Sequence, residues 1–251
     1  MKLRKLITVR EALESPAYFG GQLSGDTWRS WRIVLIAIAG EQLTRAERVV
    51  FKALTGRGRE PREPVSEFWA VIGRRGGKSL AMAVLAAYLA ACVDHRRALA
   101  PGERGVIPIL ATSTEQARSS FDFVEGVLLA SPHLYELVGS MTSDTIALKT
   151  RVSIEVRPAS FRTIRGITAV AAICDEIAVW RGDDSANPDK EILKALRPAL
   201  LTTGGMLACI SSPHAKRGEL YKTFRKHYGP DGRSSILVAH PGSRVMNPGL
   251  D

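Results

Sequence analysis

Cysteine and histidine are scarce in this sequence of 251 residues, and neither forms a metal-binding pattern. Cys92, Cys174 and Cys209 lie far apart, each inside an apolar run. This placement predicts buried, reduced thiols of an intracellular protein. The five histidines are scattered without the spacing of zinc ligands, so no zinc site is expected.

Long apolar runs are also missing. The longest, residues 33–39 and 80–93, are shorter than the roughly 20 residues that cross a bilayer, so both are expected to be buried helices. The first five residues do not resemble a signal peptide. No membrane partner is expected, and the sequence shows neither an internal repeat nor a low-complexity tail.

Positive charge is in clear excess. The chain has 35 Lys and Arg against 25 Asp and Glu, a formal net charge of +10, and its 45% hydrophobic content is typical of a globular protein. A basic protein of this kind favours a polyanionic partner, nucleic acid first. Basic residues gather in segments 57–62, 149–165 and 216–226, each of which either faces phosphates or is a solvated surface.

Short apolar runs alternate with helical patterns along the chain. This alternation predicts an α/β fold with a mostly parallel central sheet flanked by helices. Residues 1–50 are expected to be helical, and residues 56–64 form a charged linker rich in glycine and proline. Ser113 or Thr114 is expected to cap a helix. The expected strands are residues 68–72, 106–111, 145–148, 152–157, 170–174, 205–210 and 236–239.

The most informative motif is the glycine-rich turn of Gly73, Arg74, Arg75, Gly76 and Gly77. An apolar strand leads into it, and Lys78 and Ser79 open a helix, which is the arrangement of a phosphate-binding loop. Backbone N–H groups at the helix start cradle phosphates, the lysine reaches the outer ones, and the serine hydroxyl holds Mg²⁺. The usual first glycine of this motif is replaced by Ile72.

Two further strands end in residues suited to hydrolysis. Asp175 and Glu176 follow the apolar run 170–174, where one carboxylate supports Mg²⁺ and the next activates the attacking water. Ser211 and Ser212 follow the run 207–210, so their hydroxyls are placed to sense the γ-phosphate. Because the carboxyl ends of parallel strands share one edge of the sheet, the three motifs predict a single phosphoryl-transfer site.

These segments together resemble the ATPase domain of a tailed-bacteriophage large terminase, the motor that packages DNA. The resemblance runs from about residue 15 to the end of the chain. It implies a P-loop NTPase core of the ASCE or RecA-like type in residues 61–215. Residues 1–60 would be a helical segment and linker of the same ATPase domain, and residues 216–251 a lid or linker before a nuclease domain. Nuclease activity is not expected of this chain. The segments that carry the resemblance are 73–79, 112–117, 164–166, 175–176, 210–213 and 246–248.

The resemblance also implies roles for single residues. Lys78 and Glu176 would be catalytic, Ser79 and Asp175 would hold Mg²⁺, and Ser211 and Ser212 would couple hydrolysis to movement. Either Arg74 or Arg75 would touch the nucleotide from the same subunit, and the sequence does not choose between them; Arg75 is also counted among the catalytic residues. Arg165 matches the position of an arginine finger that acts on a neighbouring subunit; the alternative is a surface or DNA-facing arginine. Trp31 or Arg32 would pack on adenine, although a core position is the simpler interpretation of the tryptophan.

The function implied is ATP hydrolysis with Mg²⁺ that moves double-stranded DNA into a procapsid, in the host cell cytoplasm. The portal protein, a small terminase subunit and further copies of the chain in a ring would be its partners. Three alternatives remain at this stage: a helicase-like translocase, a basic DNA-binding scaffold without catalysis, and a small-molecule kinase. The last is disfavoured because no acceptor-binding segment is visible.

Overall fold

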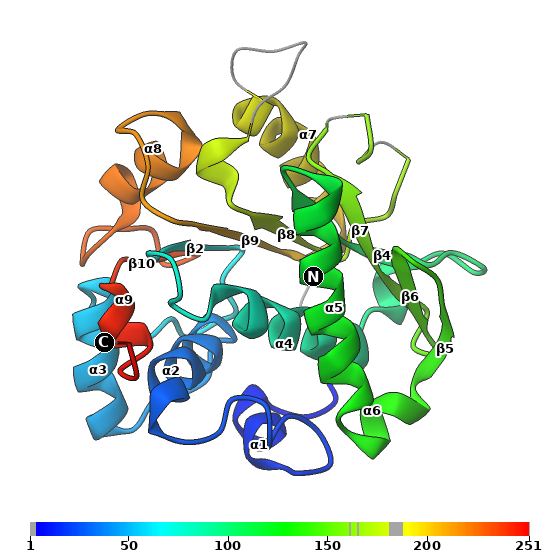
Figure 1. Ribbon diagram of the computed structural model, residues 1–251, viewed down its shortest axis with the longest axis horizontal. Helices are drawn as coiled ribbons and strands as arrows, with labels where there is room; N and C mark the ends of the chain where they lie inside the picture. The colour runs from blue at the N-terminus through cyan, green and yellow to red at the C-terminus, as the bar shows by residue number, and fades with distance from the viewer. Residues whose placement is uncertain (1–3, 161, 165, 181–187, 251) are drawn as a thin grey trace.

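The protein is described here by a computed structural model, which covers residues 4–160, 162–164, 166–180 and 188–250. Its centre is an eight-stranded sheet in the order β10-β2-β9-β8-β4-β7-β6-β5 (Figure 1). Neighbouring strands are parallel from β10 to β7 and antiparallel from β7 to β5. The strands are β2 (Glu67–Val71), β4 (Gly105–Ala111), β5 (Val138–Met141), β6 (Thr145–Leu148), β7 (Val152–Pro158), β8 (Ala171–Asp175), β9 (Met206–Ser211) and β10 (Ile236–Ala239).

Helices cover both faces of the sheet (Figure 1). One face packs against α4 and α5 and the helices of the amino-terminal segment, and the other packs against α7 and α8. The helices are α1 (Val9–Glu14), α2 (Arg29–Ile38), α3 (Arg45–Thr55), α4 (Lys78–Ala91), α5 (Thr114–Leu129), α6 (Pro132–Glu136), α7 (Pro188–Thr203), α8 (Gly218–His227) and α9 (Ser243–Met246), with short 3-10 turns η1 (Asp26–Trp28), η2 (Arg96–Ala98) and η3 (Ile177–Val179).

The predicted α/β architecture is confirmed. Strand β2 shows why its sequence is continuously apolar: Phe68 and Ala70 enter the core on one face of the sheet, while Trp69 and Val71 enter the core on the face that α7 and α8 cover. A parallel strand covered on both faces has no polar side. Strand β5 and the two-stranded sheet of β1 (Arg4–Lys5) and β3 (Val93–Asp94) were not predicted. Their few, partly exposed residues carry no clear apolar alternation.

Helix boundaries follow local chemistry. Ser113 rather than Thr114 caps α5, because its hydroxyl accepts the N–H of Gln116 at 3.2 Å. The helix after the glycine loop begins at Lys78 and ends at Ala91. Cys92, Cys174 and Cys209 are buried free thiols, as predicted. Within the described ranges, the apolar helices all fall short of what a membrane crossing requires.

The topology sets the place of the chemistry. Strands β2, β9, β8 and β4 are parallel neighbours, so their carboxyl ends meet at one edge of the sheet. The glycine loop, Asp175-Glu176 and Ser211-Ser212 all follow those ends. The prediction that the Ser-Ser strand lies beside the Asp-Glu strand is confirmed, since Asp175 pairs in register with Ile210.

Candidate active site

The glycine loop makes a tight turn between β2 and the start of α4. Arg75 has φ of 60° and Gly77 has φ of 77°, so two residues of the turn are left-handed. Gly77 is needed for a second reason, because a Cβ there would lie 2.7 Å from Cζ3 of Trp28. Alternating left- and right-handed residues form the concave backbone of an anion-binding nest. The loop therefore has the shape that its sequence predicts.

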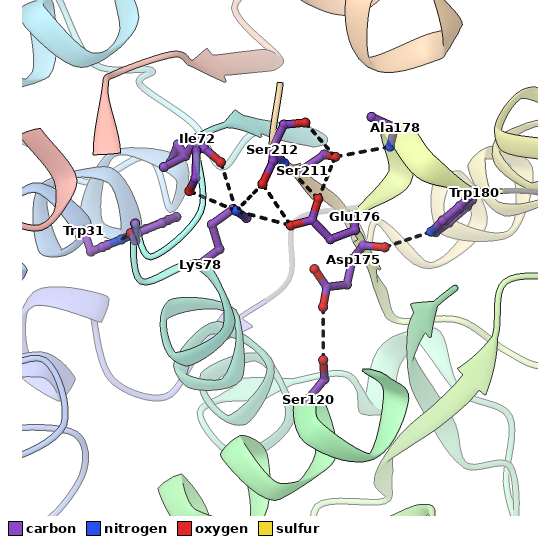
Figure 2. Close-up of polar contacts among 12 residues, drawn as sticks. Trp31, Ile72, Lys78, Ser120, Asp175, Glu176, Ala178, Trp180, Ser211 and Ser212 are labelled. Carbon is purple, nitrogen blue, oxygen red and sulfur yellow. Dashed lines mark hydrogen bonds and ion pairs between the residues drawn. The ribbon is translucent and has the colours of Figure 1, made fainter. Parts of the chain in front are cut away.

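Lys78 lies at the centre of the site. Its Nζ donates to the carbonyls of Ile72 at 2.9 Å and Gly73 at 3.2 Å, and to the Ser212 hydroxyl at 3.1 Å. The same Nζ lies 3.3 Å from Oε1 of Glu176 (Figure 2). The lysine side chain is only 8% exposed, so its charge needs these partners. One side chain thus ties together all three motifs.

Glu176 turns away from the strand that precedes it. Its φ of 48° is left-handed, an unfavourable conformation for a residue with a side chain. The turn brings its carboxylate to β9, where Oε2 accepts from the N–H of Ser212 at 2.9 Å and the hydroxyl of Ser211 at 3.0 Å. Burial alone would raise the pKa of Glu176, but these hydrogen bonds and the Lys78 ammonium outweigh it and lower that pKa. The carboxylate is therefore held ionised, as a general base must be.

Asp175 differs from its neighbour. Burial and the Glu176 charge raise the pKa of its carboxyl, whose Oδ2 accepts a hydrogen bond from the Ser120 hydroxyl at 3.1 Å. Asp175 lines one small cavity together with Ser79. A buried carboxylate that shares a cavity with a serine hydroxyl suits a hard cation such as Mg²⁺, which prefers oxygen ligands. The residues present fit the predicted metal.

The ends of β8 and β9 are braced by backbone contacts. The Trp180 indole donates to the Asp175 carbonyl at 2.8 Å, and the Ala178 N–H donates to the Ser211 hydroxyl at 3.3 Å (Figure 2). Trp180 is buried and was not singled out from the sequence. Ser211 therefore contacts both Glu176 and the turn after β8, so it joins the ends of the two strands.

A pocket of about 430 Å³ opens over these groups. Beyond the predicted residues it is lined by Trp28, Leu80, Gln116, Ser119, Ser120 and Phe123. The four residues from α5 stand at positions i, i+3, i+4 and i+7 and so lie on one face of that helix, which is the sequence signal that could have assigned them to a common site. The complete lining of this pocket, predicted and additional residues together, is Trp28, Arg74, Arg75, Gly76, Gly77, Lys78, Ser79, Leu80, Gln116, Ser119, Ser120, Phe123, Asp175 and Glu176.

The structure gives Trp31 the core position that was the simpler interpretation, and it gives Arg32 partners within its own segment. Trp31 is fully buried, and its indole donates to the Gly76 carbonyl at 2.7 Å, behind the loop. Arg32 donates to the carbonyls of Leu23 and Gly25. Neither residue lines the pocket, where Trp28 is the aromatic contribution of the amino-terminal segment. Arg74 and Arg75 both line it, and Arg165 lies outside the described residues.

A larger cavity, of about 1000 Å³, lies at the opposite end of the strands, near Glu67 and Leu207. Its wall is mainly apolar, and it includes none of the glycine loop, Asp175, Glu176 or the two serines. Size alone does not make it the reactive site, so we assign the chemistry to the smaller pocket.

Known protein-family models and curated proteins give no match to this sequence. Among solved structures, the large terminase ATPase domain of Thermus phage P74-26 and a mutant of it have TM-scores of 0.52 and 0.53 and identities of 17% and 16%. Each covers 83% of this chain, and this chain covers 81% and 82% of theirs.

The large terminase of bacteriophage HK97 has a TM-score of 0.51 and 21% identity over 83% of this chain. The matched region is 48% of the HK97 protein, so this chain spans about half of it. These likenesses show that the chain has the P-loop NTPase fold of the phage large terminase ATPase domains.

Proposed function

We propose that this chain is a Mg²⁺-dependent ATPase that drives double-stranded DNA into a phage procapsid. The observation that carries the proposal is the hydrogen-bonded cluster of Lys78, Glu176 and Ser212, in which the three predicted motifs meet. The fold shared with phage large terminase ATPase domains supports the same function.

Each residue has a role that follows from its surroundings. The loop N–H groups and Lys78 bind the phosphates, and Mg²⁺, when bound at Ser79 and Asp175, neutralises phosphate charge. Glu176, held ionised by Ser212 and Lys78, accepts the proton of the attacking water. Because Ser211 and Ser212 bind that same carboxylate, we assign them the coupling of hydrolysis to movement of β9.

DNA is the partner that the charge favours. A net charge of +10 attracts phosphates without regard to sequence, and such binding weakens steeply as salt rises. We further propose that copies of the chain form a ring on the procapsid with a portal protein and a small terminase subunit, in the host cell cytoplasm. Arg165 would then reach the nucleotide of a neighbouring subunit.

The test is ATP hydrolysis by the purified chain with Mg²⁺, with and without double-stranded DNA, beside Lys78→Ala. The proposal expects hydrolysis in the wild type, stimulation by DNA and at least a hundredfold loss in the variant. Intact DNA binding without measurable hydrolysis at high protein concentration would favour the scaffold. Strand unwinding by the isolated chain would favour the helicase-like translocase.

A further inference from the structure

Two carbonyl groups of the glycine loop are held from behind by side chains distant in the sequence. The Asn247 amide donates from Nδ2 to the Arg75 carbonyl at 3.1 Å. The Trp31 indole donates to the next carbonyl, that of Gly76, at 2.7 Å (Figure 2). The sequence predicted neither contact. Together they fix two consecutive peptide groups of the loop.

Fixing a carbonyl also fixes an N–H. In a trans peptide the two groups point in opposite directions, and every described peptide here is trans. When the carbonyls of Arg75 and Gly76 point toward Asn247 and Trp31, the N–H groups of Gly76 and Gly77 point away from them. Neither N–H finds an acceptor within the described ranges of the chain. Both glycines line the pocket, so these are donors available to a bound anion.

The loop needs such support because part of its backbone is unfavourable. Arg75 is left-handed, a conformation that a residue with a side chain rarely adopts without an outside contact. The residue's own side chain is exposed and supplies no packing. The hydrogen bond from Asn247 to the Arg75 carbonyl is therefore placed where it stabilises the strained peptide.

The two donors come from neighbouring elements, since Trp31 lies on α2 and Asn247 directly follows α9, which packs against α2. The Ser30 hydroxyl on α2 donates to the Val245 carbonyl on α9 at 2.9 Å, and Met246 is buried. The Asn247 N–H donates to the Ser243 carbonyl at 2.8 Å. The α9 segment also reaches the loop start, since a Cβ on Gly73 would lie 2.4 Å from the Ser243 hydroxyl oxygen. The loop thus rests on helices from both ends of the chain.

We propose that Asn247 and Trp31 are positioning residues that hold the glycine loop in its phosphate-binding shape before the nucleotide arrives. The inference rests on the proposed function, because its ligand is the phosphate chain of the nucleotide. Preorganised donors favour binding because the loop loses little further conformational freedom when the phosphates bind. Neither side chain lines the pocket, so we expect their loss to weaken binding and to leave the chemical step unchanged.

The test compares Asn247→Leu, which keeps the size of the side chain and removes the donor, with Asn247→Gln, which restores an amide. Val245→Ala is the matched control on the same helix, because its side chain is half exposed and its carbonyl contact to Ser30 stays. Affinities for MgADP and for pyrophosphate are measured by calorimetry, together with KM, kcat and the melting temperature. A Trp31→Phe variant, which loses the indole donor, repeats the measurement at the other carbonyl.

For Asn247→Leu we expect about fivefold weaker binding of both MgADP and pyrophosphate and a KM raised by the same factor. We expect kcat and the melting temperature to stay near the wild-type values, Asn247→Gln to recover most of the affinity, and Val245→Ala to bind like the wild type. Wild-type affinity in Asn247→Leu, or a loss in kcat alone, would overturn the positioning role while the proposed function stands. A wild type that binds neither MgADP nor pyrophosphate would overturn both.

Discussion

The ammonium of Lys78 and the carboxylate of Glu176 form an ion pair, with Nζ 3.3 Å from Oε1, that joins the start of α4 to the end of β8. Each group compensates the buried charge of the other, and Ser212 bonds to both. Lys78 keeps three other oxygen partners, the carbonyls of Ile72 and Gly73 and the Ser212 hydroxyl, so its ammonium stays held when the Glu176 charge alone is removed. The pair is the basis of the first prediction.

Replacing Glu176 with Gln is expected to separate binding from hydrolysis. The amide oxygen still accepts the Ser212 N–H, but a neutral amide takes no proton from water. We expect MgATP affinity within a few-fold of the wild type and turnover lower by about 10²–10⁴. The measurements are calorimetry and phosphate release. The control is Glu219→Gln, which changes an ion pair with Lys222 outside the pocket. Turnover near the wild-type rate in Glu176→Gln would show that Glu176 is not the general base.

Asp175→Asn is expected to stabilise the protein while abolishing activity. Since burial and the Glu176 charge raise the pKa of Asp175, the folded protein holds this proton more tightly than the unfolded chain does. Stability is therefore lost as the pH rises from the ordinary carboxyl value through the raised one, and the penalty is fully present above both. An asparagine at this position carries no charge and so removes this loss of stability, while its amide oxygen can still accept the hydrogen bond from the Ser120 hydroxyl.

At pH 8 without metal we expect Asp175→Asn to melt at a higher temperature than the wild type, by about 2–4 °C for each kcal/mol of unfolding free energy gained. We also expect MgATP to stabilise this variant less than the wild type. Asp122→Asn, in an exposed pair with Arg118, is the control and should shift little. A lower melting temperature for Asp175→Asn at pH 8 would contradict the assigned cause of the raised pKa.

Acid should weaken the link between α1 and α3. The Arg10 guanidinium donates two hydrogen bonds to Glu47, both at 2.9 Å, and with the Thr44 N–H holds the pKa of Glu47 at about 2. A lowered pKa contributes stability that is fully present above the unfolded value of 4.5 and is lost as the pH falls toward 2.

Glu47→Gln should therefore cost about 1 kcal/mol of unfolding free energy at pH 7, since a partly exposed pair is screened by solvent. The difference from the wild type should shrink steadily below pH 4.5. Urea unfolding of both proteins at a series of pH values measures this. A difference that stays constant down to pH 3 would show that the carboxylate charge is not its origin.

Arg165 offers a test of shared sites between subunits. If it completes the site of a neighbouring subunit, Arg165→Ala and Glu176→Ala are each inactive alone, but a mixture forms some interfaces in which both residues are intact. We expect the equimolar mixture to recover part of the wild-type ATPase rate, and the wild-type rate per subunit to rise with protein concentration. No recovery, with wild-type rates per subunit independent of concentration, would count against an arginine supplied in trans.

Local patterns in the sequence were sufficient for the fold and for most of the candidate site. Continuous apolar runs such as 170–174 predict parallel strands buried on both faces, because such strands have no polar side. Glycines before Lys78 predict a loop at a helix start, and the strand ends carry Asp175, Glu176, Ser211 and Ser212. Parallel strands align these ends, so the sequence also predicts that the motifs meet.

Only the tertiary structure decided what surrounds those motifs. Trp31 lies behind the glycine loop while Trp28 lines the pocket, and Asn247 reaches the loop from the other end of the chain. The left-handed turn that aims Glu176 at Ser212 is likewise invisible in the sequence. Such contacts depend on how distant segments pack in three dimensions, whereas sequence periodicity reports only which side of a nearby element is buried. The sequence by itself thus determined which groups gather at the candidate site, and tertiary packing decided how they are held, because a hydrogen bond between distant segments leaves no periodic trace in either of them.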